Sequence, residues 1–98
     1  MIPLQAALKW AENKQLKSLK DVNNGECENF AMDFLHLFPN GDIVGTDNFV
    51  ELFGKDWPGG HIWIMSDDKH YDSETLEGVS NWRDLPFFTR NRGSVSEL

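Results

Sequence analysis

An apolar stripe at helical spacing runs through residues 26–38 and constrains the fold more than any other feature of the chain. Its members stand at positions i, i+3, i+4, i+7, i+8 and i+11 and are Cys27, Phe30, Ala31, Phe34, Leu35 and Phe38. This spacing places all six side chains on one face of an α-helix. That face must be covered by another layer of the protein, and the breaker FPNGD at residues 38–42 predicts where the helix ends.

A second helix is expected over residues 3–20, within an N-terminal segment that spans residues 1–22. Its apolar positions follow helical spacing, with a phase slip after the first four, and are Leu4, Ala7, Leu8, Ala11, Leu16 and Leu19. Pro3 suits the first turn of a helix, where its missing N–H is not needed. The turn cluster DVNNG at residues 21–25 predicts the end of this helix.

The clearest strand signals lie in the second half of the chain. Residues 61–65, HIWIM, form the best strand candidate. The polar residues 66–69 predict a turn, and residues 70–74, HYDSE, are then expected to return as a second strand. These two segments predict an antiparallel hairpin.

The remaining segments carry weaker signals. Ile43–Val44 are expected to start a short strand, and residues 46–54 to form a short helical turn with a polar cap. Residues 81–88 are apolar and are expected to be extended, and Pro86 favours a sheet edge or an irregular segment. The polar tail, residues 89–98, is expected to be flexible.

This order of elements predicts the fold class. Helices come first and a small antiparallel sheet follows, which is typical of an α+β fold with the N-terminal helices packed on the sheet. A chain of 98 residues is long enough for one modest core but not for two. We therefore expect a single domain over residues 1–98.

Composition excludes several classes of function. The formal net charge of −7 repels nucleic-acid phosphates, and no basic stripe offsets it, so no nucleic-acid partner is expected. The single cysteine excludes an internal disulfide and a cysteine-based zinc site, and it fits a reducing compartment. The three histidines, His36, His61 and His70, lack metal-ligand spacing. We expect neither a metal nor another cofactor.

The sequence also predicts no association with a membrane. No apolar run approaches the roughly 20 residues that a membrane-spanning helix needs. The N-terminal stretch MIPLQAALKWAENK lacks the basic region and unbroken apolar stretch of a signal peptide. The expected location is therefore the cytoplasm.

Cys27 has two interpretations at the start of its helix. On an apolar face it is a small core residue, since free cysteine is among the most buried residue types. At a helix N-terminus it is also placed to be a nucleophile, because backbone N–H groups and the helix dipole favour a thiolate. Gly25 would permit close backbone approach, and the side-chain amide of Asn23 or Asn24 could support an oxyanion. The adjacent Glu26 and Glu28 oppose thiolate formation.

A base for this thiol is offered by His61, which opens the best strand after two glycines. If residues 66–69 form the hairpin loop, Met65 pairs with His70, Trp63 with Asp72, and His61 with Glu74. Asp72 is then the diagonal neighbour of His61 on the same face, and Glu74 is the second candidate to orient the imidazole. A loop shorter by one residue would put Tyr71 and Ser73 on that face instead.

Several stretches of the chain resemble the papain-like superfamily of cysteine hydrolases. GECENFA, which contains Cys27, is similar to the nucleophile helix of CHAP amidases. GGHIWIM is similar to the base-bearing strand of CHAP, NlpC-type and transglutaminase-like members, and its His-x-Trp form, His61 and Trp63, is closest to the last of these. HYDSE resembles the following strand, whose aspartate, here Asp72, orients the histidine. GVSNWRDLPFF resembles a segment of small phage or prophage members.

The resemblance covers residues 23–88 as a minimal papain-like core, with the cysteine on a helix N-terminus and the histidine and aspartate on adjacent strands. It implies that Cys27 is the nucleophile, His61 the general base and Asp72 the orienting group of an amide hydrolase or acyl transferase. The implied substrate is a peptide, a protein side-chain amide or peptidoglycan, attacked through a covalent acyl-enzyme. The chain is short for this superfamily, so the substrate groove is expected to be minimal or to be supplied in part by a partner protein. A phage-encoded member would act in the host cytoplasm.

Two alternatives stay open at this point. One is a non-catalytic, acidic interaction or inhibitor protein on the same fold, which the flanking glutamates and the short chain would suit. The other is an unrelated α+β domain in which Cys27 is only a core residue.

Overall fold

Four strands form one antiparallel sheet in the order β1-β2-β3-β4 in the computed structural model, which describes residues 1–45 and 61–90. The strands are β1 (Asp42–Gly45), β2 (Ile62–Ser66), β3 (Lys69–Asp72) and β4 (Thr75–Val79). The helices are α1 (Leu4–Asn13), α2 (Leu19–Val22), α3 (Cys27–Phe34) and α5 (Pro86–Arg90), with 3₁₀ turns at Leu35–Leu37 and Trp82–Asp84. The expected α+β class is confirmed.

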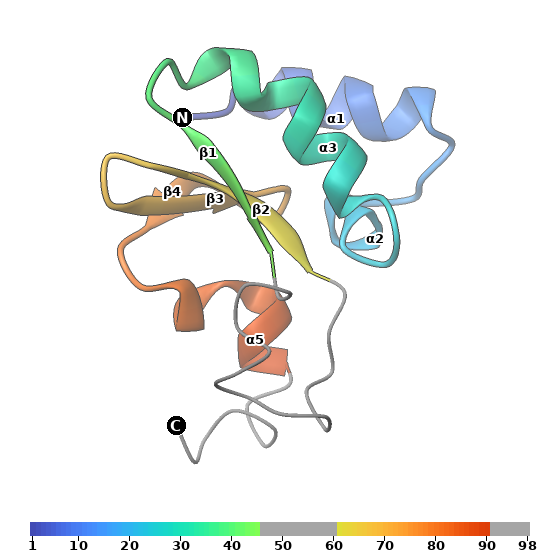
Figure 1. Cartoon of the computed structure of the whole chain (residues 1–98). Coiled ribbons are helices and arrows are strands. Elements are labelled where there is room, and N and C mark those ends of the chain that lie inside the picture. The colour runs from blue at the N-terminus through green and yellow to red at the C-terminus, as the bar shows by residue number, and fades with distance from the viewer. Residues whose placement is uncertain (46–60, 91–98) are drawn as a thin grey trace.

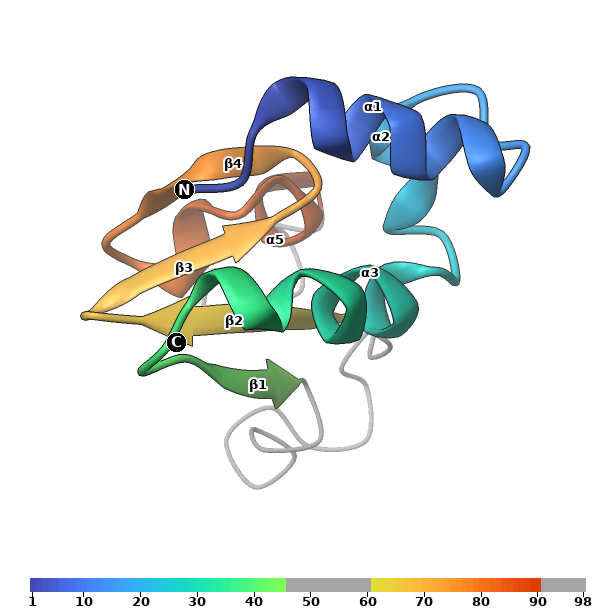
Figure 2. The same cartoon turned by 90° about the horizontal axis from the view of Figure 1, so that it is seen from above.

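The helices cover both faces of the sheet. α1, α2 and α3 lie on one face, and the C-terminal α5 lies on the other (Figures 1 and 2). Because strand side chains alternate, neighbouring residues of β2 enter different cores. Ile64 packs with the α1 and α3 side chains, whereas Trp63 packs with Leu85 and Phe88 below the sheet. No helix in the described ranges is long and apolar enough to span a membrane.

The hairpin between β2 and β3 has the predicted register. Met65 pairs with His70, and Ser66 with Lys69, which leaves a two-residue turn. Both turn residues, Asp67 and Asp68, have positive φ angles, of 50° and 64°. Two successive left-handed residues match the right-handed twist of the flanking strands, and aspartate tolerates that conformation. The prediction of Met65 opposite His70 is therefore confirmed, although the turn is two residues long and not four, and the three-residue loop that would reverse the parity is excluded.

The expectation of one helix over residues 3–20 is wrong. The chain leaves α1 after Asn13, and Gln15 adopts a positive φ of 60°. A new helical turn then begins at Leu19, where the Ser18 side chain accepts a hydrogen bond from the Asp21 N–H. The phase slip in the apolar pattern marks this break. Of the four apolar positions before it, Ala7 and Ala11 are buried, whereas Leu4 and Leu8 are exposed.

The helix expected over residues 26–38 is shorter than predicted. It runs as α3 from Cys27 to Phe34 and tightens into the 3₁₀ turn Leu35–Leu37. Cys27, Phe30, Ala31, Phe34 and Phe38 are buried as the stripe predicts.

The C-terminal expectations need correction. Residues 81–88 are not extended, since they form the Trp82–Asp84 turn and most of α5. Pro86 takes the first position of α5, where proline is well tolerated. The returning strand stops at Asp72, and β4, which the sequence pattern did not predict, follows a tight turn. Thr89 and Arg90 belong to α5, while the expected turn at 46–54 and the rest of the tail lie outside the described residues.

Gly78 in β4 should not tolerate a side chain. Its φ is +84°, and a Cβ there would lie 2.6 Å from a ring carbon of Tyr71. We expect Gly78→Ala to lower the free energy of unfolding by about 1–3 kcal/mol, from backbone strain and overpacking. Urea denaturation measures this loss. Gly25→Ala is the matched variant, since Gly25 also has a positive φ but open space around its Cβ position, and an equal loss in both variants would contradict the role of the Tyr71 contact.

Candidate active site

Cys27, His61 and Asp72 come together at one end of the sheet. Cys27 is the first residue of α3, which packs on β2 and β3. His61 immediately precedes β2, and Asp72 is the last residue of β3. Because β2 and β3 are antiparallel, the start of one lies beside the end of the other. The hairpin register thus delivers the imidazole and the carboxylate to the same place.

The imidazole and the carboxylate form a buried pair. His61 Nε2 lies 2.9 Å from Asp72 Oδ2, and the two residues are 0% and 3% exposed. Burial raises the pKa of the Asp72 carboxyl, whereas the hydrogen bond and charge of His61 lower it. The Thr75 hydroxyl and the Glu74 N–H lower it further, so the pKa lies below its ordinary value. Asp72 is therefore held as an anion next to His61.

The Cys27 thiol interacts with the same imidazole. Burial raises the pKa of the thiol, but hydrogen bonding to His61, the Ile62 N–H, the charge of His61 and the Glu28 N–H together outweigh it. The net pKa is lower than the ordinary value for cysteine. His61 Nε2 is occupied by Asp72, and the buried Nδ1 has no partner at standard hydrogen-bond geometry in the described part of the chain, so Nδ1 is the imidazole nitrogen that remains to interact with the thiol.

His61 lies between aromatic rings on the α5 side of the sheet. The Phe87 ring stacks on the imidazole at a centroid distance of 4.6 Å and an interplanar angle of 14°, and Trp63 stacks at 5.4 Å. Burial lowers the pKa of His61, but hydrogen bonds and charges from Asp72 and Cys27 raise it above its ordinary value. A lowered thiol pKa and a raised imidazole pKa both favour a thiolate–imidazolium pair.

The predicted supporting residues have other contacts. The Trp63 indole N–H donates to His70 Nδ1 at 2.9 Å, which anchors the ring beside His61. Glu74 does not pair with His61, because the chain turns after Asp72, and its carboxylate instead accepts from the Asn23 side-chain amide at 2.9 Å. Asn24 is exposed. One donor of the Asn23 amide nitrogen is thus engaged by Glu74.

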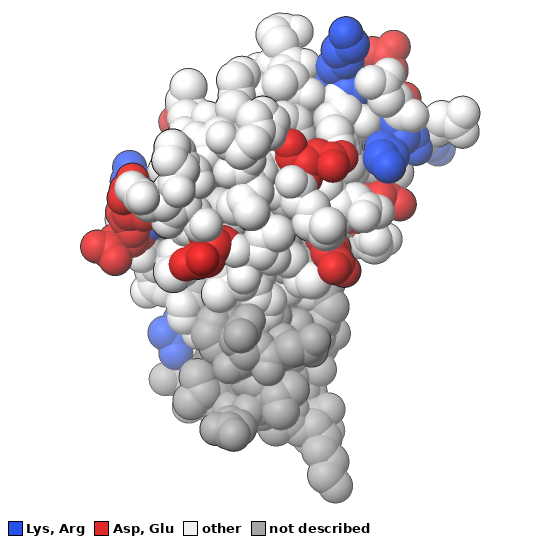
Figure 3. All heavy atoms as spheres, turned by 45° about the horizontal axis from the view of Figure 1, so that its top comes forward, with Lys and Arg blue, Asp and Glu red and all other residues white. Residues whose placement is uncertain are grey.

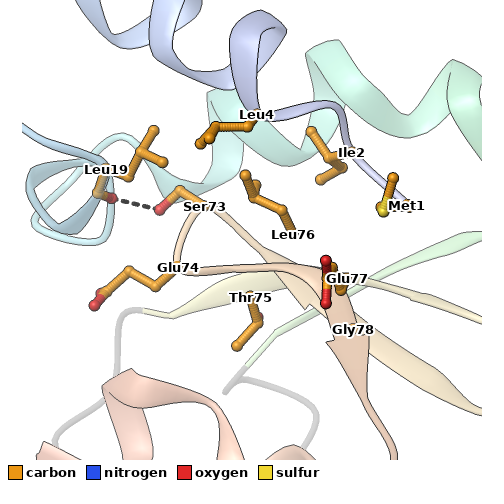
Figure 4. A pocket seen from close by; sticks show the side chains of 10 residues that line it. All are labelled: Met1, Ile2, Leu4, Leu19, Ser73, Glu74, Thr75, Leu76, Glu77 and Gly78. Atoms are coloured by element: carbon orange, nitrogen blue, oxygen red, sulfur yellow. Dashed lines mark hydrogen bonds between the residues drawn. The ribbon is translucent and has the colours of Figure 1, made fainter.

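The alternative pair for the imidazole, Tyr71 and Ser73, lies elsewhere. Tyr71 packs in the core on the helix side of the sheet. The Ser73 hydroxyl donates to the carbonyl oxygen of Leu19 at 2.6 Å, as Figure 4 shows. Parity therefore separates both residues from His61.

The residues around Cys27 differ in part from expectation. Gly25 has a φ of +125°, so glycine is needed for its backbone conformation and not for close approach of another group. Glu28 is exposed, and Glu26 accepts a hydrogen bond from the Asn29 side chain at 3.0 Å. The backbone N–H of Glu28 lowers the pKa of the thiol. The N-terminus of α3 thus helps to lower the thiol pKa.

Three residues at the site escaped sequence reasoning. The Thr75 hydroxyl donates to Asp72 Oδ1 at 2.7 Å, and Arg90 binds the Glu74 carboxylate at 2.9 Å. Phe87 covers the imidazole. A threonine three residues after an aspartate is typical of a turn closed by side chains, and this was the one available signal. Arg90 and Phe87 belong to a segment that was expected to be extended or flexible.

Two further features are the distribution of potential metal ligands and a groove beside the site. Within the described ranges, no group of three or more His, Cys, Asp and Glu side chains could hold a metal ion. A groove separates β4 from the N-terminal segment and α1, with Ile2, Leu4, Leu19 and Leu76 among its apolar lining residues and Glu74 and Glu77 among its polar ones (Figure 4).

Comparison with protein-family models, curated proteins and solved structures found no match to this chain. No relative therefore supports or opposes membership of the papain-like superfamily.

Proposed function

We propose that this protein is a cysteine-dependent amide hydrolase or acyl transferase with Cys27 as its nucleophile. The observation that carries the proposal is the buried sequence of contacts from the Cys27 thiol through His61 to Asp72, with the thiol at the N-terminus of α3. A nucleophile, a base and a group that orients the base are the parts that thiol catalysis requires. Peptides, protein side-chain amides and peptidoglycan amides are the proposed substrates.

The first half of the reaction forms an acyl-enzyme. The Cys27 thiolate attacks the amide carbonyl carbon and forms a C–S bond, while the carbonyl oxygen takes up the negative charge. His61, protonated at Nδ1, gives that proton to the amide nitrogen, the C–N bond breaks, and an amine leaves. Asp72 keeps Nε2 protonated and stabilises the imidazolium.

The second half regenerates the thiolate. His61, now neutral, removes a proton from a water molecule, or from an amine in a transferase. The resulting nucleophile attacks the thioester carbonyl, the C–S bond breaks, and the acid or the new amide is released. The thiolate and the imidazolium are then restored, so no external oxidant or reductant is needed.

The proposal is tested with p-nitrophenyl acetate, an activated ester that needs little binding energy. We expect rapid release of p-nitrophenolate and an acetyl adduct on Cys27 by intact-mass spectrometry. Cys27→Ser should lose the thioester adduct, and His61→Ala should lose the fast phase. The proposal fails if native Cys27 is acetylated no faster than free cysteine at the same pH.

A second candidate function is supported by the burial of the site. Cys27 is 6% exposed and His61 is 0% exposed, which suits a non-catalytic interaction protein that keeps the three residues as a structural unit. On the face shown in Figure 3, acidic side chains form several separate patches, and basic side chains gather mainly near one end. Such a surface favours a basic protein partner. Absence of acetylation together with a normal fold would favour this candidate.

A further inference from the structure

The Glu74 carboxylate joins two side chains that are far apart in the sequence. It accepts from the Asn23 side-chain amide at 2.9 Å, and Arg90 Nη1 lies 2.9 Å from both of its oxygens. The side chains of Glu74 and Arg90 are 16% and 33% exposed, and Asn23 is 4% exposed. Charge-assisted hydrogen bonds in such a partly dry setting are stronger than neutral ones.

These contacts connect the three parts of the fold that carry the proposed site. Asn23 ends α2 and lies in the short link that leads into Cys27. Glu74 lies in the turn between β3 and β4, two residues after Asp72. Arg90 ends α5, whose Phe87 stacks on His61. The Glu74 carboxylate therefore connects the segment that leads into Cys27 to two segments beside the His61 imidazole. These are the end of β3 with the turn after Asp72, and α5.

The same turn also holds Asp72 in place. The Glu74 N–H donates to Asp72 Oδ1 at 2.9 Å, and the Thr75 hydroxyl donates to that oxygen at 2.7 Å. The Asp72 N–H in turn donates to the Thr75 hydroxyl at 3.2 Å. With Oδ1 occupied in this way, Oδ2 is the oxygen that meets His61. A shift of this turn would move the carboxylate relative to the imidazole.

We propose that Glu74 is a positioning residue, whose bonds to Asn23 and Arg90 set the placement of Cys27 relative to the His61–Asp72 pair. This inference rests on the proposed function, because it assigns a role to a residue that acts through the three others. Its physical basis is that the Glu74 bonds add fixed polar contacts between the link before Cys27, the turn after Asp72 and α5, beside the contacts that the thiol itself makes. Polar contacts with fixed geometry define such a placement more narrowly than apolar contacts do.

The test is the pH profile of iodoacetamide alkylation of Cys27 in the native protein. We expect Glu74→Ala to raise the midpoint by about one pH unit, which is about a tenfold lower alkylation rate below the midpoint. Glu77→Ala is the matched control, since Glu77 is an exposed carboxylate farther along β4 and should leave the midpoint unchanged. Arg90→Gln removes only the Arg90 contact, and it should raise the midpoint in the same direction even if Glu74→Ala does not fold.

The measurement separates this inference from the proposed function. A purely structural role would lower the melting temperature of Glu74→Ala and Arg90→Gln but leave their midpoints at the wild-type value, and that result would overturn the inference. If His61→Ala also leaves the midpoint unchanged, the proposed function itself fails. If His61→Ala raises the midpoint but neither Glu74→Ala nor Arg90→Gln does, the positioning role of Glu74 is wrong and the proposed function stands.

Discussion

Replacing His61 with alanine should move the alkylation midpoint of Cys27 up to or beyond the ordinary thiol pKa of 9.0. In the native protein, burial raises the pKa of Cys27, and hydrogen bonding to His61 and its charge are prominent among the contacts that reverse that effect. Without the imidazole, the burial contribution dominates. We expect the alkylation rate at pH 7 to fall at least about tenfold, since one unit of pKa changes the thiolate fraction by that factor.

Two controls make this result specific. His36→Ala removes an exposed histidine that is bonded to the Asp33 carbonyl oxygen, and it should not change the profile. The urea-unfolded wild type should show the ordinary midpoint of cysteine. If native wild-type Cys27 reacts only after unfolding, it is a core residue and the catalytic proposal is wrong.

Replacing Asp72 with alanine should cost the largest amount of stability. The carboxylate is 3% exposed and pairs with a fully buried imidazole, and removing one partner of such a pair typically costs about 3–5 kcal/mol. The Glu74 N–H and the Thr75 hydroxyl also lose their acceptor. Urea denaturation measures the loss. Asp42→Ala, which removes an exposed carboxylate from β1, should leave the free energy of unfolding within about 0.5 kcal/mol of wild type.

The loss should depend on pH in a defined way. The pKa of Asp72 lies below its ordinary 3.8, so its contribution is complete above pH 3.8 and disappears as pH falls through the folded-state pKa. The pKa of His61 lies above its ordinary 6.5, so its contribution is complete below pH 6.5 and disappears as pH rises through the folded-state pKa. The difference between wild type and Asp72→Ala should therefore be greatest between pH 3.8 and 6.5. If the difference in free energy of unfolding between wild type and Asp72→Ala stayed constant from about pH 3 to about pH 9, a range that spans the ordinary pKa values of both groups, that result would contradict the buried ion pair.

The hairpin shows how much of the site was available from local sequence. A polar turn between two strand segments sets the register, and strand alternation then decides which side chains share a face. Those two rules place Asp72 on the face of His61, and the structure has them 2.9 Å apart. The helical stripe likewise identifies the buried face of α3. Both signals are local, because each depends only on neighbours in the chain.

The errors arose where a local pattern has more than one solution. Apolar residues at positions 81–88 fit an extended segment or a short helix equally well, and packing against Trp63 accompanies the helix. β4 has an irregular pattern with Gly78 as its penultimate residue, and its strand conformation depends on pairing with β3. Asp72 and Glu74 were both candidates to orient the His61 imidazole, and the choice between them depended on where β3 ends. The contacts between Asp72 and Thr75 decide that end.

By itself, the sequence determined that Cys27 and His61 are the candidate nucleophile and base and that Cys27 lies on the apolar face of its helix, because helix and strand periodicity are properties of the chain. Only the tertiary structure decided the electrostatics. The thiol pKa of Cys27 is the balance between burial, which raises it, and contacts with His61, Ile62 and Glu28, which lower it. Those contacts act through space between segments far apart in the chain, so flanking glutamates alone could not predict their sum. The tertiary structure likewise gave Glu74 its partners, Asn23 and Arg90.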